Sequence, residues 1–239
     1  MTKLYNYLTL FLIGIYIIYL FVINKLVFLI HLRYLWLTLG CAGLIALVGM
    51  IGSISVCKGN YRIFNSPKKF LSWNFAILIL VAGMFAVPIK SLSIESFNLR
   101  SSKTAINFTD EEKKQVKQKL GKGIDSSTFK FFDWINAKSL NENGIFRDKK
   151  FKGSGFITAG KTPSTFELSR FVVSCCVVDA TPVSLTVEYD YIKDFKPSDW
   201  VQIEGQFVIK TVEDKNQPII IPTSISKIPE PDNVYLDRT

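Results

Sequence analysis

Residues 4–23 read LYNYLTLFLIGIYIIYLFVI, a run of 20 residues without a charged side chain. At a rise of about 1.5 Å per residue, a helix of this length crosses the roughly 30 Å hydrocarbon layer of a bilayer. Lys3 precedes the run as in a signal peptide, but the run is longer than a signal sequence needs, and residues 21–25, FVINK, offer no small-residue cleavage site. We therefore expect an uncleaved membrane-spanning helix.

Two further apolar stretches are long enough to span a bilayer. They comprise residues 34–56 and 70–89, and Pro88 stands where the last helix can stop. The sequence thus predicts a three-helix transmembrane domain over residues 1–90, with the lipid bilayer as its surroundings.

Small side chains recur along the second stretch. Spacings of four, three and four residues place them on one helical face, and they are Ala42, Ala46, Gly49 and Ser53. Helices in lipid associate where small residues let their backbones approach closely. We expect this face to pack against another helix, either in a partner protein or in the same chain.

The positive charge of the chain is concentrated near the predicted membrane segments. Residues 1–100 carry nine basic residues and one acidic residue, so eight of the nine net positive charges lie there. Basic residues in such positions set membrane topology and meet anionic lipid head groups, whereas a nucleic-acid-binding domain gathers them on one soluble face. Nucleic acid is therefore not expected as a partner.

The loop between the second and third stretches fixes the expected orientation. It carries four basic residues and no acidic one: Lys58, Arg62, Lys68 and Lys69. Because cytoplasmic loops are enriched in Lys and Arg, this loop is expected inside. The N-terminus is then cytoplasmic and the C-terminal domain extracytoplasmic.

Residues 91–150 read as a polar tether followed by amphipathic helices. Residues 109–112, TDEE, give the Thr-x-x-Glu pattern that caps a helix through reciprocal hydrogen bonds, and a helix to about Leu120 should follow. A second helical piece is expected over residues 128–140, before Asn143 and Gly144 interrupt the pattern. This part should form a short helical spacer.

Residues 151–239 change to short runs rich in β-branched and aromatic residues, separated by turn residues. The predicted strands are residues 151–158, 166–174, 183–191, 200–212 and 219–228. A small five-stranded barrel of the oligonucleotide/oligosaccharide-binding type (OB-like) fits this strand count. The expected fold class is thus an α+β membrane protein with three transmembrane helices, a helical spacer and an extracytoplasmic OB-like β-barrel.

Cys175 and Cys176, with Asp179 shortly after them, form the compact reactive constellation of the sequence. Two thiolates and a carboxylate make a soft, incomplete ligand set suited to zinc or copper(I), with a further ligand to come from the solute or a partner chain. Neighbouring residues of a flat strand point to opposite faces, so both thiols reach one ion only if the strand bends or ends there.

Two other interpretations of the cysteine pair stay open. The pair could be two small residues buried in the barrel core, or a thiol redox centre in an oxidising compartment. Cys41 and Cys57 lie in or beside a membrane stretch and are expected to act as small apolar residues. His31 is the sole histidine, which excludes Ser-His-Asp, Cys-His and His-based zinc chemistry within the soluble part.

Residues 171–180, FVVSCCVVDA, resemble the permease subunits of the YcgQ type. Further similarity lies in residues 87–93 (VPIKSLS), 200–205 (WVQIEG) and 228–231 (IPEP). The resemblance implies a three-helix membrane protein with a C-terminal barrel, often encoded beside a larger permease, and thus implies a larger multi-spanning permease subunit as partner.

The expected function is a non-enzymatic accessory subunit of a membrane permease, whose outer barrel binds a metal ion or a thiol-reactive solute through Cys175, Cys176 and Asp179. The predicted membrane segments hold charged residues at their ends only, so the transport path should belong to the partner. The alternatives are a membrane-anchored thiol redox or metal-dependent enzyme and a structural assembly factor.

Overall fold

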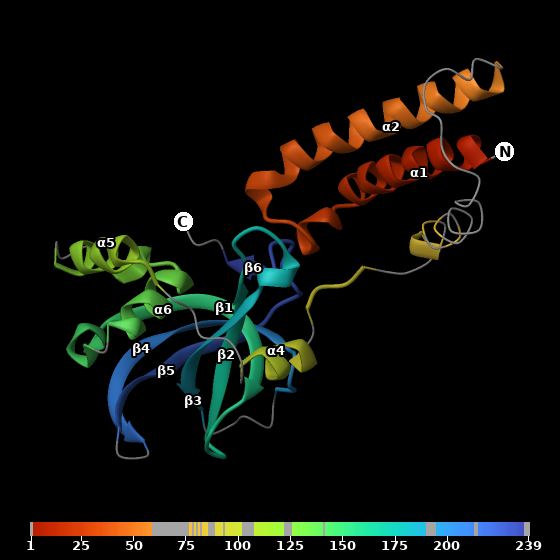
Figure 1. Ribbon diagram of the computed structural model, residues 1–239. Coiled ribbons are helices and arrows are strands. Elements are labelled where there is room, and N and C mark those ends of the chain that lie inside the picture. Colours follow the sequence, from red (N-terminus) through yellow and green to blue (C-terminus); the bar gives the residue numbers. More distant parts are fainter. Residues whose placement is uncertain are drawn as a thin grey trace. The chain divides into compact units, whose positions relative to one another are not determined.

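The computed structural model describes residues 2–58, 77, 79, 81, 83–85, 89–92, 94–101, 108–121, 126–140, 142–189, 195–212 and 215–236. The chain divides into two compact units, Met1–Ser91 and Leu92–Thr239. The first is helical, and the second combines helices with a β-sheet (Figure 1). The α+β class expected from the sequence is confirmed, and each unit is considered separately below.

The first unit contains the helices α1 (Thr2–Val22) and α2 (Leu35–Cys57), joined by the 3₁₀ turns η1 (Leu26–Phe28) and η2 (Leu32–Tyr34). Within the described residues, two stretches are long and apolar enough to cross a membrane, Leu4–Val22 and Leu32–Cys57. The first two predicted spans are thus present as helices that are long and apolar enough to cross a membrane. The third predicted span, residues 70–89, lies mostly outside the described residues. Phe85, which is described, contacts Tyr16 of α1 edge-to-face, with 4.7 Å between the ring centroids.

The small-residue face of α2 packs against α1. Ala42, Ala46 and Gly49 are buried, and a Cβ added at Gly14 of α1 would overlap Ala42 and Ala46. Ser53, which the spacing placed on this face, is only partly buried and donates its hydroxyl to the carbonyl of Gly49. Gly52 takes the buried position instead, where its missing side chain accommodates the ring of Tyr7. A helix of a partner protein or of the same chain was expected to pack on this face, and the structure shows α1 of the same chain there.

Helices occupy the N-terminal part of the second unit. They are α4 (Ile94–Ser101), α5 (Asp110–Gly121), η4 (Ser126–Thr128), α6 (Phe131–Ser139) and η5 (Asn143–Phe146). The predicted cap of α5 is present, since the Glu112 carboxylate accepts from the Thr109 N–H at 2.7 Å and the Thr109 hydroxyl accepts from the Glu112 N–H at 3.3 Å. α4 lies in the stretch expected to be a tether, so that part of the prediction is corrected.

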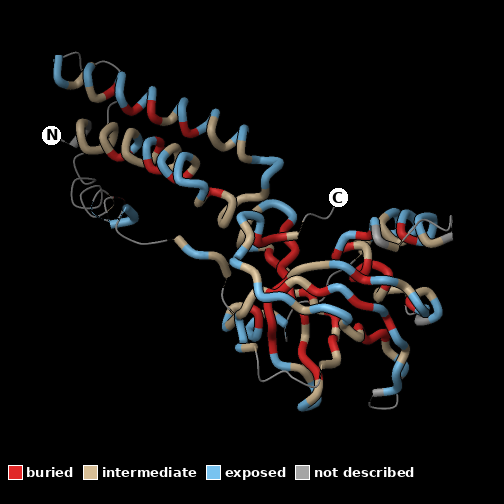
Figure 2. Tube along the Cα trace, turned by 180° about the vertical axis from the view of Figure 1, so that it is seen from behind, coloured by how far each residue is buried: buried red, intermediate tan, exposed pale blue. Residues whose placement is uncertain are grey.

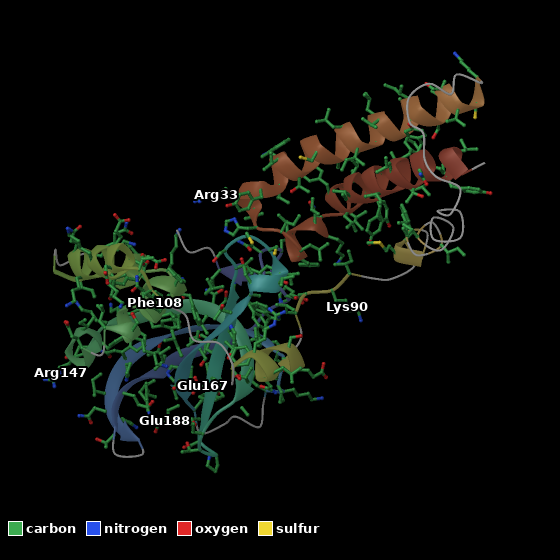
Figure 3. All side chains as sticks on the ribbon, in the orientation of Figure 1. Arg33, Lys90, Phe108, Arg147, Glu167 and Glu188 are labelled. Carbon is green, nitrogen blue, oxygen red and sulfur yellow. The ribbon has the colours of Figure 1, made fainter. Side chains whose placement is uncertain are left out.

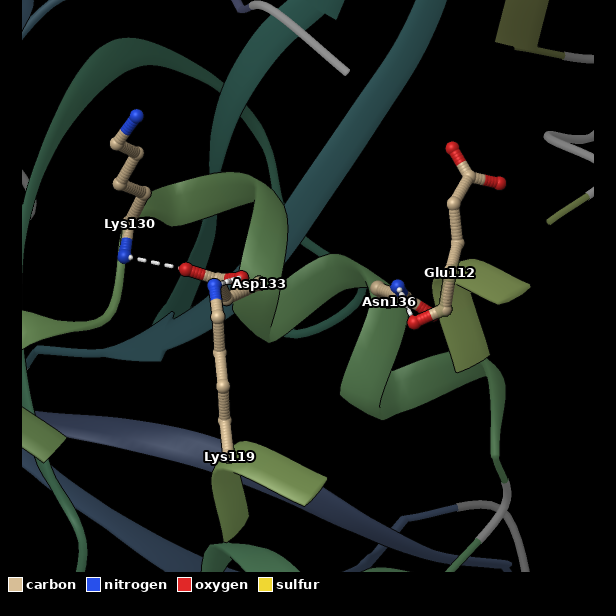
Figure 4. Close-up of polar contacts among 5 residues, drawn as sticks. All are labelled: Glu112, Lys119, Lys130, Asp133 and Asn136. Atoms are coloured by element: carbon tan, nitrogen blue, oxygen red, sulfur yellow. Dashed lines mark hydrogen bonds and ion pairs between the residues drawn. The ribbon is translucent and has the colours of Figure 1, made fainter. Parts of the chain in front are cut away.

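Polar contacts join α5 to α6 (Figure 4). The Asn136 side chain donates to the backbone carbonyl of Glu112 at 2.8 Å. The Asp133 carboxylate accepts from the backbone N–H of Lys130, the residue immediately before α6. It also pairs with Lys119 of α5 at 2.7 Å. The helices therefore belong to the compact unit that contains the sheet.

The sheet contains the strands β1 (Lys150–Ala159), β2 (Thr165–Val172), β3 (Thr181–Glu188), β4 (Trp200–Val212), β5 (Lys215–Lys227) and β6 (Tyr235–Leu236). The five predicted strands are present with shifted ends, and the two-residue β6 is additional. The order is β1-β4-β5-β3-β2-β6, and β1 also pairs with β2. Hydrogen bonding therefore runs from β1 through four other strands and back to β1.

The core of the second unit lies between α6 and the sheet, and Figure 2 shows buried residues along the strands. Trp134 of α6 is fully buried and stacks on Phe146 and on Phe207 of β4, with 4.7 Å between the Trp134 and Phe207 centroids. Phe108 packs on Phe132 at the edge of this cluster (Figure 3). Aromatic pairs of this kind add roughly 0.5–1.5 kcal/mol each beyond the burial of their surface.

Arg170 of β2 is a buried cation, 6% exposed, that ties three segments together. Its guanidinium donates to the carbonyls of Ser154 in β1 and of Asn233 and Tyr235 at the C-terminal end, at 3.2, 2.9 and 3.5 Å. It also lies over the ring of Trp200 at 5.0 Å. Burial lowers the pKa of Arg170 to about 10, so the side chain stays protonated at neutral pH. This arrangement fixes β6 beside the end of β2.

Candidate metal site

The cysteine pair lies where the chain leaves the sheet. β2 ends at Val172, and the N–H of the buried Val173 donates to the carbonyl of Leu236 in β6 at 3.4 Å. Ser174 and Cys175 then form a bend, and the 3₁₀ turn η6 (Val177–Asp179) leads into β3. The two cysteines are therefore outside the flat part of the strand, and the alternation that would separate their side chains does not apply.

Both thiols reach the same side of this loop. The Sγ atoms of Cys175 and Cys176 lie 3.6 Å apart, both residues are free thiols, and Cys175 is exposed while Cys176 is partly buried. With an oxygen of Asp179, the three ligand atoms lie within 4.8 Å of one another. The interpretation of the pair as buried core residues is wrong, because Cys175 is exposed and Cys176 is only partly buried.

Asp179 organises the loop. Its carboxylate accepts the N–H of Ser174 at 3.0 Å and the N–H of Cys175 at 2.7 Å. Its own N–H donates to the carbonyl of Cys176 at 3.0 Å, which closes the turn. One carboxylate thus holds the backbone of the cysteine pair while lying beside both thiols.

The protonation states follow from these contacts. The thiol of Cys175 donates to Cys176 Sγ at 3.6 Å and lies beside the Asp179 carboxylate. Its interactions with Asp179 first, and with Cys176 second, raise the pKa of Cys175 to about 12. Partial burial opposes ionisation of Asp179. The neighbouring Cys175 thiol and the hydrogen bonds from the N–H groups of Ser174 and Cys175 nevertheless lower the pKa of Asp179. At neutral pH the metal-free site is an ionised carboxylate beside a protonated Cys175 thiol.

A family model described as the DUF1980 C-terminal domain matches residues 102–237, more than half of the chain. The chain belongs to the DUF1980 family. The match includes the whole sheet and all three candidate ligands, whereas α4 precedes it. No curated protein matches the chain.

Cys175 lacks the pKa shift that is typical of an activated cysteine nucleophile. Reactive cysteines carry a lowered pKa, because the thiolate is the attacking species, and Cys175 has the opposite shift. A divalent or monovalent soft metal displaces the thiol protons on binding, so the two sulfur atoms and the Asp179 oxygen can act together as ligands.

The other candidates from the sequence belong to the first unit. Cys41 and Cys57 are free thiols of α2 in the first unit. His31 caps the turn η2 through its Nδ1, which accepts the N–H of Arg33 at 3.1 Å. Sequence reasoning missed Arg100, whose side chain in α4 binds carbonyls of the DUF1980 domain loop that carries Asp179.

Proposed function

We propose that Cys175, Cys176 and Asp179 bind a soft metal ion, zinc in the first place, and that the chain is a non-enzymatic accessory subunit of a larger membrane permease. The observation that carries the metal assignment is the convergence of three ligand atoms within 4.8 Å, on a loop with an exposed cysteine. Two sulfurs and one carboxylate oxygen are ligands that zinc accepts in proteins.

The sulfur separation favours zinc over copper(I). Two sulfurs bound at about 2.3 Å to a tetrahedral ion lie roughly 3.8 Å apart, close to the 3.6 Å between the Cys175 and Cys176 Sγ atoms. A linear copper(I) site would need a much wider separation. The three ligands leave one tetrahedral position open, which a solute group or a partner chain can fill, and such an open site suits transfer of the ion.

The strand pairing supports an OB-like barrel as the carrier of this site. The pairing runs β1-β4-β5-β3-β2 and closes from β2 to β1, and β3 pairs parallel to β5. A sheet whose last strand pairs with its first encloses its own core. The third transmembrane helix over residues 70–89 and the extracytoplasmic position of the barrel complete this proposal, the latter supported by the basic loop of residues 58–69.

The accessory role rests on the composition of the membrane helices. Leu4–Val22 and α2 contain no charged residue, whereas ion routes through membranes are marked by ionisable side chains inside the bilayer. A multi-spanning partner would therefore supply the path, in agreement with the resemblance of residues 171–180 to YcgQ-type permease subunits. The barrel would bind the ion or a thiol-reactive solute outside the membrane.

The metal proposal is tested on the full chain, purified in detergent under anaerobic reducing conditions. Elemental mass spectrometry should find close to one zinc per chain, lost in the C175S/C176S double variant and retained in the matched C41S/C57S variant. Copper in place of zinc would keep the site and correct the ion. Absence of metal after incubation with either ion would refute the proposal.

The partner proposal needs a separate measurement. The tagged full chain is extracted from native membranes in a mild detergent, and its co-purifying proteins are identified by mass spectrometry. A stoichiometric multi-spanning membrane protein is the expected result. A chain recovered as a homogeneous species without such a protein, after cross-linking before extraction, would contradict the accessory role.

A further inference from the structure

Arg100 of α4 holds both ends of the turn that carries Asp179. Its Nη1 donates to the carbonyl of Val177 at 3.0 Å and to the carbonyl of Ala180 at 2.9 Å. These two carbonyls bracket η6, whose last residue is Asp179. The Arg100 guanidinium therefore contacts the turn at its first residue, Val177, and at Ala180, the residue that follows it.

The helix that presents Arg100 is itself anchored on the sheet. Phe97 is 7% exposed, and its ring contacts those of Phe156 in β1 and Phe171 in β2 edge-to-face, at 5.6 and 5.7 Å between centroids. Phe97 and Arg100 are three residues apart, so they lie on the same side of α4. The aromatic contacts thus hold the helix in the position from which Arg100 reaches the loop.

We infer that Arg100 is a positioning residue for the metal site, an inference that rests on the proposed function. Asp179 must present its carboxylate to the ion while its backbone stays in the turn that brings the two thiols together. By holding the carbonyls of Val177 and Ala180, Arg100 limits rotation of the Val177–Val178 and Ala180–Thr181 peptide groups, which lie one residue before and one residue after those joined to Asp179. Because α4 is the first helix after the unit boundary at Ser91, the ligand loop is tied to the segment that enters from the membrane unit.

The test compares R100Q and R100K with R147Q in the full chain. Arg147 is an exposed arginine of the same unit, on the side away from α4 (Figure 3), which makes it a matched control for the loss of one positive charge. Zinc affinity is measured by competition with a chelating dye. Amide hydrogen exchange at Ser174 and Cys175 is measured in zinc-free protein, because both N–H groups are bonded to Asp179.

R100Q should lower zinc affinity about tenfold or more, the usual effect of removing a group that orients a metal ligand. It should also speed exchange of the Ser174 and Cys175 amides without zinc, while R100K retains part of both properties and R147Q behaves like the wild type. Unchanged thermal unfolding of R100Q would show that the effect is local to the loop.

Two outcomes separate this inference from the metal proposal. Wild-type zinc affinity and wild-type amide exchange in R100Q would overturn the role of Arg100 and leave the metal site standing. If the wild-type chain binds no zinc but R100Q still speeds exchange at Ser174 and Cys175, the metal proposal fails and the positioning of the loop by Arg100 is supported.

Discussion

The backbone N–H of Cys175 donates to the carboxylate of Asp179 at 2.7 Å, and the Cys175 thiol lies beside the same carboxylate. The charged carboxylate therefore holds the backbone of Cys175 and, by lying beside its thiol, opposes formation of the thiolate. Such hydrogen bonds to an ionised group are stronger than neutral ones. Loop geometry and thiol reactivity should therefore change together when Asp179 is altered.

The D179N substitution should make Cys175 more reactive. The interaction with Asp179 is the largest cause of the raised pKa of Cys175, so that pKa should fall from about 12 toward its ordinary value of 9.0. Because the thiolate is the alkylated species, iodoacetamide should modify Cys175 at pH 8 about tenfold faster or more in D179N. Peptide mass spectrometry under reducing conditions reads each cysteine separately, with Cys41 as an internal reference. Equal rates at Cys175 in both proteins would contradict the effect of Asp179 on the thiol.

Removing the buried guanidinium in R170M should destabilise the second unit by about 3 kcal/mol, since three carbonyls lose their donor at once. The melting temperature, followed by tryptophan fluorescence in detergent, should fall by roughly 5–10 °C. Exchange of the Val173 N–H, which is bonded to Leu236, should accelerate as β6 detaches. The exposed Arg147 provides the control R147M. A melting temperature within one degree of wild type would show that Arg170 does not hold β6.

The contact between α1 and α2 should be broken by G49L and not by G43L. A Cβ at Gly49 would overlap the backbone of Phe11 in α1, whereas a Cβ at Gly43 meets nothing within 4 Å. Overpacking of this kind costs about 1–3 kcal/mol. The fraction folded is measured by circular dichroism in mixed micelles with increasing dodecyl sulfate, where G49L should unfold earlier. Equal transitions for the two variants would mean that the face of α2 bearing Gly49 does not contact α1 closely.

The D199N substitution should reveal a pH-dependent contribution to stability. The Asp199 carboxylate pairs with Lys227 at 2.7 Å and accepts the Lys196 N–H, and these contacts lower the pKa of Asp199. A lowered carboxyl pKa stabilises the fold above the unfolded value near 3.8, and this contribution is lost as the pH falls through the folded pKa. D199N should therefore melt below wild type at pH 7, with the difference shrinking below pH 4 and at high salt. A difference that stays constant with pH would contradict the ionic origin.

The strands were predictable because alternation is a local signal. Val183, Leu185 and Val187 are buried, and the residues between them are only partly buried, as the sequence of β3 suggests. The two long apolar helices α1 and α2 were predictable for the same kind of reason, since length and apolarity suffice. The sequence did not predict α4, with eight residues, or β6, with two, because such short elements show too little periodicity. Both are held in place by residues distant in the sequence.

The composition of the loop that carries Cys175, Cys176 and Asp179 could be predicted from the sequence, but its geometry could not. The sequence showed Cys175, Cys176 and Asp179 together, but convergence of the thiols depends on where β2 ends and on backbone hydrogen bonds to Asp179. Arg100 bonds to residues 77 and 80 positions away, and no local pattern encodes such a contact. In α2, spacing alone could not show that Gly52 rather than the adjacent Ser53 is the buried residue. Gly52 is the position at which the ring of Tyr7 approaches the helix backbone.

The compact unit starts at Leu92, ten residues before the family match. A fragment excised at the family boundary would keep the sheet and the three ligands but begin beyond Phe97 and Arg100. Its Phe156 and Phe171 rings would lose the aromatic cover of α4, and the turn at Asp179 would lose its cation. Where the chain is cut therefore decides whether an isolated domain reports the native ligand loop, and residue 92 is the place to begin.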